Sequence, residues 1–190
     1  LVEPYLTGSH EAWARGYRDH SRHTVRLLTL PGQFWKWRMQ GGALTLARQA
    51  QALDETPDLI LATSMLNVPV FLAFAGRRVA EVPLVVYFHE NQLTYPLRPG
   101  EKRDLGYGFI NLVSALRADW VCFNSAYHRD SFLDELPRLL KHYPDFSELW
   151  TVEALAARSQ VLPLGLDLAR LDAYRSAETP SGRPLILWNH

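Results

Sequence analysis

The sequence predicts an α/β fold in which a parallel, doubly wound sheet is covered by helices. Short runs rich in Val, Ile, Leu and Phe recur along the chain, with longer segments of helical spacing between them. This alternation is typical of parallel strands joined by crossover helices. The runs are continuously apolar, as expected for strands covered on both faces. With 190 residues, 47% of them hydrophobic, the chain can bury one sizeable core.

Six strands are expected, and each is a short apolar run bounded by polar or turn-forming residues. They are Leu1 to Glu3, Thr24 to Leu30, Leu59 to Thr63, Leu84 to His89, Trp120 to Asn124 and Gln160 to Leu164. The long apolar stretch that starts at the third run approaches the length of a membrane span, but Ser64, Asn67 and Pro69 interrupt it. We therefore expect a strand, a polar turn and a helix there, and no membrane partner.

Helices are expected between the strands, where apolar residues fall three or four positions apart. In the segment after residue 102, Leu105, Phe109 and Leu112 have this spacing, so one stripe of that helix is predicted to be buried. Ser9 is the candidate N-cap of the first helix, and Pro137 is expected to break or kink the fifth. The other helices are expected at Glu11 to Ser21, Trp37 to Asp54, Val70 to Arg78, Ala126 to His142 and Ser147 to Arg158, with a short one between Asp167 and Tyr174.

The domain organisation follows from a change in composition near the end of the chain. Residues 1–175 are expected to form one domain. Residues 176–184, where Pro, Ser, Gly and charged residues dominate, are predicted to be a linker. Residues 185–190 are a further apolar run, which we expect to be the first strand of a second, C-terminal domain. Because the chain starts without Met inside a strand-like run, we expect both ends to be cut.

Charge and cysteine content restrict the function classes. Twenty Lys and Arg residues balance twenty Asp and Glu residues, so no overall field attracts nucleic acid or anionic lipid, and any polyanion must be held by a local patch. The single cysteine, Cys122, cannot form an internal disulfide, which fits a reducing compartment and a cytoplasmic protein. No signal-peptide pattern opens the chain.

The residues after each predicted strand are the candidates for a functional site, because open parallel sheets bind ligands beyond the carboxyl ends of their strands. These positions are strongly polar and suit a hydroxylated ligand. The candidates for binding an acceptor or a sugar are His10, Asn67, Glu90, Asn91, Gln92, Asn124 and Ser125. His89 is the candidate catalytic residue, because an imidazole with a pKa of about 6.5 can act as acid, base or neutral hydrogen-bond donor. The alternative is that His89 only caps its own strand.

The turn at Gly8 and Ser9 is the candidate site for a phosphate group. It follows the first strand and opens a helix, where free backbone N–H groups and the positive end of the helix dipole favour an anion. The spacing matches neither a dinucleotide fingerprint nor a Walker A loop. A Gly-Ser pair is also an ordinary helix start, so the position beyond the strand carries the functional interpretation. We expect this turn and His89 to lie on one common concave wall.

A run of aromatic and cationic residues follows the second strand and is the candidate nucleic-acid-binding segment. Aromatic rings can stack on bases while cations hold the phosphates. The residues are Trp35, Lys36, Trp37 and Arg38, preceded by Phe34. The alternative is that the rings pack into the core while the cations reach outward. No metal site is expected, because His20 and His23 have no partner with ligand spacing.

Several motifs of this chain occur together and in order in a known family. They are Glu3-Pro4-Tyr5 with Gly8-Ser9-His10, Leu30-Pro31 with Trp35-Lys36-Trp37-Arg38, Tyr87-Phe88-His89-Glu90-Asn91-Gln92 with Tyr95-Pro96, Arg103-Asp104 with Tyr107-Gly108, and Phe123-Asn124-Ser125. The chain resembles the N-terminal domain of the tRNA-queuosine alpha-mannosyltransferase family over nearly its whole length. The closing run from Leu185 to His190 is similar to the entry of that family into its second domain.

The resemblance implies the N-terminal, acceptor-side half of a GT-B glycosyltransferase, an architecture of two Rossmann-like domains. The family transfers mannose from GDP-mannose, with retention, to a cyclopentene hydroxyl of queuosine in tRNA. By resemblance, Gly8 and Ser9 approach the donor diphosphate, and His89 contacts the donor sugar. The C-terminal domain would bind the nucleotide, so this chain alone would be inactive, and no cofactor is expected besides the donor substrate.

Two other functions remain open from the sequence. One keeps the architecture and changes the chemistry, to a GT-B glycosyltransferase or a nucleotide-sugar epimerase with a non-RNA substrate. The other is a non-catalytic RNA-binding module that uses the segment from Phe34 to Arg38 and the face of the first helix that carries Arg15. Neutral net charge gives no independent support for binding tRNA.

Overall fold

The computed structural model describes residues 1–175 and 182–183 of the chain. Within those residues six parallel strands form one sheet in the order β2-β1-β3-β4-β5-β6. The strands are β1 (Val2–Leu6), β2 (Leu28–Pro31), β3 (Ile60–Thr63), β4 (Leu84–Phe88), β5 (Trp120–Phe123) and β6 (Ser159–Val161). The fold is therefore the predicted doubly wound α/β class, and it is Rossmann-like.

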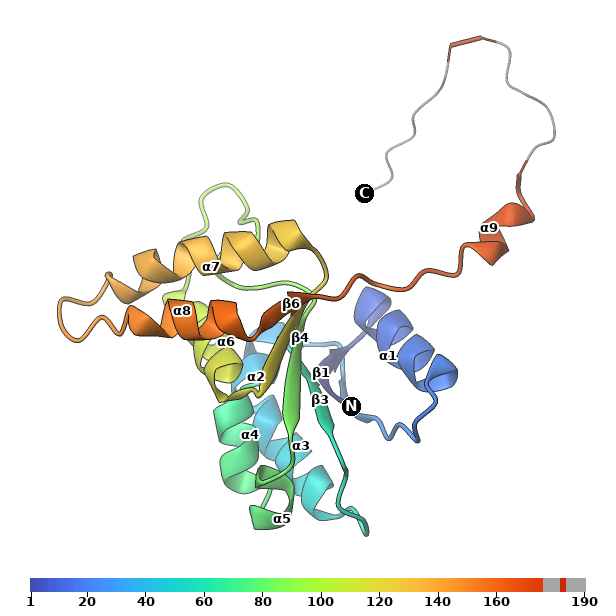
Figure 1. Cartoon of the computed structure of the whole chain (residues 1–190), viewed down its shortest axis with the longest axis horizontal. Coiled ribbons are helices and arrows are strands. Elements are labelled where there is room, and N and C mark those ends of the chain that lie inside the picture. Colours follow the sequence, from blue (N-terminus) through green and yellow to red (C-terminus); the bar gives the residue numbers. More distant parts are fainter. Residues whose placement is uncertain (176–181, 184–190) are drawn as a thin grey trace.

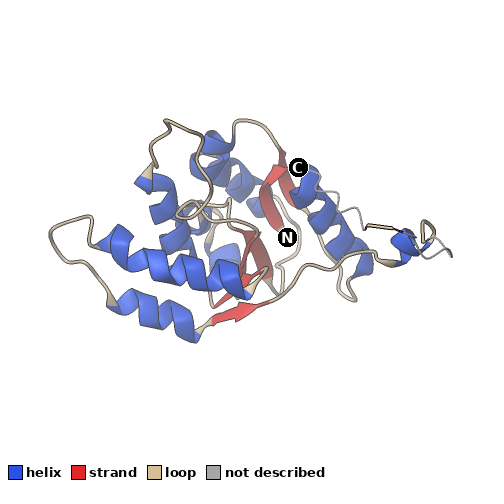
Figure 2. Cartoon of the chain, turned by 90° about the horizontal axis from the view of Figure 1, so that it is seen from above, coloured by secondary structure: helices blue, strands red, loops and turns tan. Residues whose placement is uncertain are grey.

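Helices cover the two faces of the sheet unequally. They are α1 (Gly8–His20), α2 (Trp35–Gln40), α3 (Gly42–Gln51), α4 (Val68–Phe74), α5 (Arg77–Ala80), α6 (Leu105–Arg117), α7 (Ala126–Leu140), α8 (Trp150–Ala157) and α9 (Ala169–Asp172). Figure 1 shows α1 on one side of the sheet and α3, α4 and α6 on the other. Helices α7 and α8 lie alongside each other in both Figure 1 and Figure 2. The face beside α1 is thus the less covered one.

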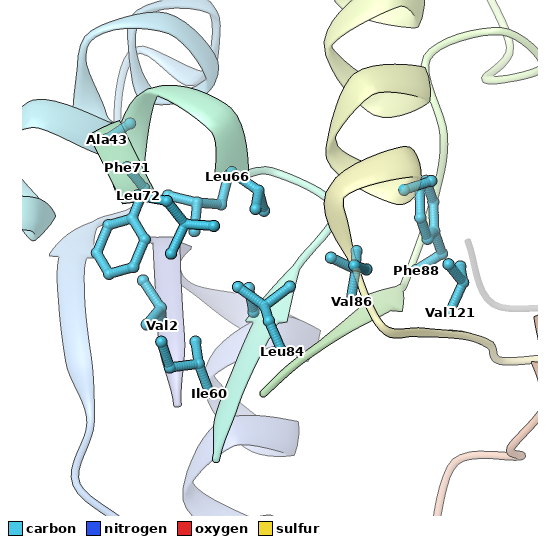
Figure 3. Packing of buried hydrophobic residues seen from close by; sticks show 14 of the residues in the cluster. Val2, Ala43, Ile60, Leu66, Phe71, Leu72, Leu84, Val86, Phe88 and Val121 are labelled. Atoms are coloured by element: carbon cyan, nitrogen blue, oxygen red, sulfur yellow. The ribbon is translucent and has the colours of Figure 1, made fainter. Parts of the chain in front are cut away.

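The main core lies between the sheet and the larger helical layer. Alternate strand residues point to this side, so Leu84, Val86 and Phe88 of β4 are fully buried while Val85 between them is half-buried. Figure 3 shows Val2 of β1 next to the ring of Phe71 on α4. Burying a side chain of this size stabilises the fold by about 1.5 to 3 kcal/mol, which fixes the strands and hence the position of the loops that follow them.

The order in which successive strands join the sheet reverses at β1. From β1 the chain runs to β2 on one side and then crosses back to β3 on the other side. In the described part of the chain, β1 and β3 pair at the single register position of Val2 and Ala62, so β1 continues to Leu6 beyond the point where β3 ends at Thr63. A crevice at such a switch point is where ligands bind in open α/β sheets.

All six predicted strands are confirmed, with shifted ends. β1 continues to Leu6, three residues beyond the prediction, and β2 begins at Leu28 instead of Thr24. The helix predicted from 37 to 54 is two helices that meet at Gly41, and the helix predicted from 70 to 78 is divided at Gly76, which has φ +82°. A positive φ is unfavourable for residues other than glycine, and it ends α4.

Two expectations about helix ends are not met, namely Ser9 as the N-cap of α1 and a break of α7 at Pro137. Helix α1 begins at Gly8, so Thr7 and not Ser9 occupies the N-cap position, and the Thr7 side chain makes no capping hydrogen bond. Helix α7 does not end at Pro137 but continues to Leu140. Leu136, Leu139 and Leu140 are buried, and this packing offsets the backbone hydrogen bond that the proline removes.

The predicted C-terminal segments are only partly described. The short helix expected between Asp167 and Tyr174 is α9. The predicted linker at 176–184, apart from residues 182–183, and the predicted strand at 185–190 lie outside the described residues. Among the described residues, no helix combines the length and the apolar character that crossing a membrane would require.

Candidate functional site

A cavity of about 720 Å³ opens at the carboxyl edge of the sheet. Its walls come from the turn after β1, from the start of α2 and from the loop between β4 and α6. The lining includes Gly8, Ser9, His10, Glu90 and Gln92, which were all sequence-predicted site residues. A second cavity, of about 340 Å³, is lined mainly by residues at the amino ends of the strands, away from the polar turns. The larger cavity is therefore the candidate site.

A chain of hydrogen bonds links Glu3, His10 and Glu90 at this cavity. His10 Nδ1 lies 2.9 Å from Glu3 Oε2, and His10 Nε2 lies 3.1 Å from Glu90 Oε2. Glu3 is fully buried, and its other oxygen accepts a 2.7 Å hydrogen bond from the Tyr5 backbone N–H. Each ring nitrogen of His10 thus faces a carboxylate oxygen.

The strand and helix geometry explains this arrangement. Val2 points into the main core, so Glu3, the next residue of β1, points to the opposite face, where α1 packs. His10 lies in the first turn of α1, above Glu3, and Glu90 follows β4. Burial disfavours the charged form of His10, but the hydrogen bonds to Glu3 and Glu90 outweigh it and raise the pKa of His10 to about 10. His10 is therefore an imidazolium at neutral pH.

His89 has the opposite protonation state. Its half-buried ring packs on His10, Trp13 and Tyr87, with centroid distances of 4.6, 4.6 and 4.9 Å. Burial, followed by the positive charge of His10 and the nearby His128, lowers the pKa of His89 to about 3. Its Nε2 atom is buried and has no hydrogen-bond partner among the described residues. His89 is thus a neutral imidazole with an unused polar atom.

The expectation of one common wall for Gly8, Ser9 and His89 is only partly correct. Gly8 and Ser9 line the cavity, whereas His89 is not among its lining residues. The reason is that the His89 ring packs against Trp13 and Tyr87 on the face of the sheet beside α1. Of the rings that contact it, His10 is the one that lines the cavity.

Gly8 and Ser9 are exposed at the N-terminus of α1, which is 13 residues long. Gly8 has φ +51°, and a Cβ atom added there would meet nothing within 4 Å. Backbone N–H groups of the first helical turn lack helical partners, and the helix dipole is positive at this end. The turn therefore has the features on which the prediction of an anion site rests, and it lies at the cavity.

The loop after β4 is held in place by residues that sequence reasoning missed. The buried side chain of Asn111 on α6 accepts a 2.7 Å hydrogen bond from the Gln92 backbone N–H and donates one of 2.9 Å to the Ser64 carbonyl. The Arg103 guanidinium donates to the carbonyls of Gln92 and Tyr95, at 2.6 and 2.9 Å. An amide on the buried stripe of an apolar helix is the signal that could have identified Asn111.

Glu3 was also missed, although the family motif included it. A carboxylate inside a run that is otherwise apolar and predicted to be buried is the signal that could have identified it, because a buried carboxylate needs a partner.

The side chains of four predicted site residues form hydrogen bonds within the fold, at helix caps and in loops. Asn67 caps α4 by accepting from the Val70 N–H, and Ser125 caps α7 by accepting from the His128 N–H. Asn91 accepts from the N–H groups of Leu93 and Thr94 and donates to the Thr94 hydroxyl. Asn124 donates a 2.8 Å hydrogen bond to the His89 carbonyl and lies 3.0 Å from His128 Nδ1. None of the four is among the residues that line the cavity.

The aromatic and cationic segment forms one rim of the cavity. Trp35 and Lys36 line it, and the Trp35 ring packs on Tyr107 with centroids 5.0 Å apart. Phe34 and Trp37 are exposed by 77% and 59%, so the prediction that rings remain available at the surface holds for them. Arg38 donates a hydrogen bond to the Pro31 carbonyl and is not among the lining residues. The facing loop adds Arg98 and Lys102 to the lining.

Glu3, His10 and His89 are also the one group among the described residues whose donor atoms could hold a metal ion, since these atoms lie within 4.8 Å of one another. A metal bound by His10 would have to replace one of the two hydrogen bonds of its ring, to Glu3 or to Glu90. We interpret the group as an ion pair beside a neutral histidine, because the carboxylates and the imidazolium already satisfy one another.

Comparison with known proteins agrees with the family named on the sequence motifs. Residues 1–166 match the family model described as tRNA-queuosine alpha-mannosyltransferase N-terminal. A curated tRNA-queuosine alpha-mannosyltransferase from Drosophila melanogaster is 33% identical over 171 residues, which are 90% of this chain and 45% of the relative. The chain thus spans about half the length of the curated relative that it matches. No solved structure matches the chain.

Proposed function

The chain belongs to the tRNA-queuosine alpha-mannosyltransferase family, and on that basis we propose that it is the acceptor-side, N-terminal half of a GT-B glycosyltransferase. The observation that carries the proposal is the cavity of about 720 Å³ at the switch point of the sheet, with Gly8, Ser9, His10 and Glu90 in its wall. The position suits a ligand shared with a second domain, because such cavities form where domains meet.

The full-length protein, in this proposal, transfers mannose from GDP-mannose to a hydroxyl of queuosine in tRNA, with retention of configuration. It acts in the cytoplasm, and a C-terminal domain binds the nucleotide, so residues 1–190 alone are inactive. This chain covers 45% of the relative, so the relative is long enough to contain a second domain.

The turn at Gly8 and Ser9 is proposed to stabilise the donor diphosphate. The free N–H groups of α1 point towards the cavity end of the helix, where negative charge is favoured. As the bond between the sugar carbon and the phosphate oxygen breaks, charge develops on the departing diphosphate. Fixed N–H donors stabilise that charge without rearranging.

His89 is proposed to hydrogen-bond the donor sugar as a neutral imidazole. A pKa of about 3 makes it a weak base at neutral pH, so it does not fit the role of general base. Its Nε2 has no partner among the described residues and could be satisfied by a ligand hydroxyl. Because His89 does not line the cavity, the sugar has to reach this atom past the His10 ring, which packs on His89. The proton of the acceptor hydroxyl then passes to a phosphate oxygen of the leaving diphosphate as the new glycosidic bond forms.

The acceptor side is proposed to lie along the rim at Trp35, Lys36, Arg98 and Lys102. The first two come from α2 and the other two from the loop after β4, so cations stand on both sides of the opening, and Glu101 and Asp104 lie beside the second pair. Exposed rings at Phe34 and Trp37 suit stacking on unpaired bases, and the cations suit the phosphates beside them. These cations supply a local attraction for the phosphates of tRNA, which the neutral net charge of the chain does not supply.

The proposal is tested by incubating the full-length protein with a panel of nucleotide sugars, with tRNA that contains queuosine and with the same tRNA lacking it. Transfer of mannose from GDP-mannose to queuosine alone is the expected result. Transfer to another acceptor would support a GT-B enzyme with a non-RNA substrate. Tight tRNA binding without any transfer would support the RNA-binding module.

A further inference from the structure

We infer that Glu3 and His10 are positioning residues, which hold the Glu90 carboxylate in the cavity as the acceptor for two neighbouring hydroxyl groups of a ligand. This inference rests on the proposed function, and it adds the chemistry that the site recognises and the residues that prepare it. The class of ligand is a vicinal diol. It can come from the donor sugar or from the cyclopentene ring of the acceptor.

Glu90 is the member of the hydrogen-bonded chain that a ligand can reach. It lines the cavity, and its side chain is 23% exposed, whereas the side chains of His10 and Glu3 are 10% and 0% exposed. Its Oε2 faces His10 Nε2, and its Oε1 has no hydrogen-bond partner among the described residues. An ionised carboxylate offers about four acceptor sites. One is used by His10, so the remainder can accept from two adjacent hydroxyls.

Glu3 cannot touch a ligand, so any role in binding must act through His10. Both Glu3 oxygens are used, one by His10 and one by the Tyr5 N–H. A fully buried carboxylate is costly unless it is paired, and here it faces one nitrogen of a ring whose other nitrogen faces Glu90. Glu3 thereby fixes the ring orientation and keeps both nitrogens protonated, since an imidazole needs two N–H groups to donate to two carboxylates.

The loop that carries Glu90 is fixed from a second side. Asn111 and Arg103 bind the backbone at Gln92, and Asn124 binds the carbonyl of His89. The backbone on both sides of Glu90 is therefore held, and the His10 contact fixes the carboxylate itself. A carboxylate that is held before the ligand arrives binds hydroxyls without the entropy cost of ordering its own side chain.

A buried ion pair that only stabilises the fold is the competing explanation, and kinetics distinguishes the two. Four variants of the full-length protein are compared: Glu90→Gln, Glu3→Gln, His10→Gln and, as a matched control, Glu11→Gln. Glu11 lies next to His10 on α1, but its carboxylate pairs with Arg15 and is 40% exposed. Thermal unfolding reports on folding. Initial rates give kcat and KM for each substrate, and equilibrium binding is measured with GDP-mannose and with a queuosine-containing anticodon stem-loop.

Glu90→Gln is expected to fold, since the side chain is partly exposed, and to lower kcat/KM on the order of tenfold to a hundredfold, because hydrogen bonds to a charged group are lost. Glu11→Gln is expected to behave as the wild type. If the donor supplies the diol, binding of GDP-mannose weakens in Glu90→Gln. If the acceptor supplies it, binding of the queuosine stem-loop weakens and that of the same stem-loop with guanosine does not.

Glu3→Gln distinguishes a positioning role from a purely structural one, because a purely structural role would not shift the pH dependence of the rate. The titratable groups that face the His10 ring are Glu3, Glu90, His89 and Tyr5, whose ring lies edge-on to it with centroids 6.2 Å apart. Losing the Glu3 charge makes His10 easier to deprotonate, so the alkaline limb of the pH–rate profile moves to lower pH in Glu3→Gln. His10→Gln, which has no such proton to lose, is expected to remove that limb altogether.

The inference is overturned if Glu90→Gln keeps the wild-type kcat, KM and binding of both ligands, or if Glu3→Gln folds with an unshifted alkaline limb. If Glu3→Gln fails to fold, Glu90→Gln and His10→Gln still decide. Wild-type protein that transfers no sugar contradicts the proposed function, and the binding measurements then test Glu90 separately. Wild-type protein that binds neither ligand overturns both.

Discussion

The rings of His10 and His89 lie 4.6 Å apart between centroids, and the two residues carry different charges at neutral pH. Two carboxylates hold His10 in its charged form. Burial and the charge of His10 itself hold His89 in its neutral form. A neighbouring pair of histidines thus offers one cationic and one neutral group at the end of a parallel sheet. Groups whose environments push their pKa values apart are typical of functional sites.

The first prediction concerns stability at alkaline pH. The pKa of His10 is raised from 6.5 to about 10 in the folded protein, so its stabilising contribution is complete below pH 6.5 and is lost as the pH rises towards 10. Urea unfolding at a series of pH values should show a free energy of unfolding that decreases across this range. In His10→Gln the decrease should be smaller, whereas in His23→Gln, which changes an exposed histidine, it should persist.

The second prediction is the opposite trend on the acid side. The pKa of His89 is lowered to about 3, so its contribution is complete above pH 6.5 and is lost as the pH falls towards 3. An NMR titration of the histidine rings should find His89 neutral at pH 5, where His10 is charged. A His89 ring that protonates near pH 6.5 would contradict the burial that the structure gives it.

The third prediction compares two amide side chains. Asn111→Ala removes the partners of the Gln92 N–H and the Ser64 carbonyl inside the fold, and each buried group left unsatisfied costs about 1 to 3 kcal/mol. Asn67→Ala removes only a helix cap, which costs about 1 kcal/mol. Denaturant unfolding should therefore show the larger loss for Asn111→Ala. Equal losses would mean that the loop after β4 is not anchored by Asn111.

The fourth prediction uses two glycines of the same helix. Gly8→Ala places a side chain at φ +51°, which costs about 1 to 2 kcal/mol, and puts a methyl group at the proposed diphosphate site. Its KM for the nucleotide sugar should rise. Gly16→Ala, in the middle of α1 with free space around it, should gain up to about 1 kcal/mol of stability and keep its KM. An unchanged KM in Gly8→Ala would remove this turn from donor binding.

The fifth prediction concerns the rim. If Lys36 and Arg98 contact phosphates, neutralising each should reduce the slope of log affinity against log salt by about 0.7 to 0.9 for tRNA binding by the full-length protein. Phe34→Ala should weaken binding without changing that slope, because stacking involves no ion release. Arg138→Gln on α7, an exposed cation outside the cavity lining, serves as the control. Slopes that match the wild type in both cation variants would exclude this rim.

The fold was predictable because its signal is repeated along the chain. Each strand is an apolar run of its own, and alternation with helical segments permits few topologies. The errors lie at helix boundaries, where a single residue determines whether the helix ends or continues. Gly41 and Gly76 each divide what periodicity alone joins into one long helix, and burial beside Pro137 carries α7 past a residue that usually ends a helix.

The candidate site was predictable in position and less so in detail. The polar residues after the strands include those that line the cavity, but Asn67, Asn91 and Ser125 hold turns and helix caps. The same side chains suit caps and ligands, and the sequence does not tell where each one points. Glu3 and Asn111 escaped notice because their importance depends on residues that are distant in the sequence. Glu3 is linked to Glu90 through His10, and Asn111 binds the backbone of Gln92.

The central proposal is that this edge of the sheet takes part in sugar transfer. The most direct test is the turnover number of full-length His89→Ala for transfer of mannose from GDP-mannose to queuosine-containing tRNA, with exposed His20→Ala as the control. Losing one preorganised hydrogen bond should lower turnover on the order of 10²-fold, while the control keeps the wild-type rate. A folded His89→Ala variant that turns over as fast as the wild type would contradict the account.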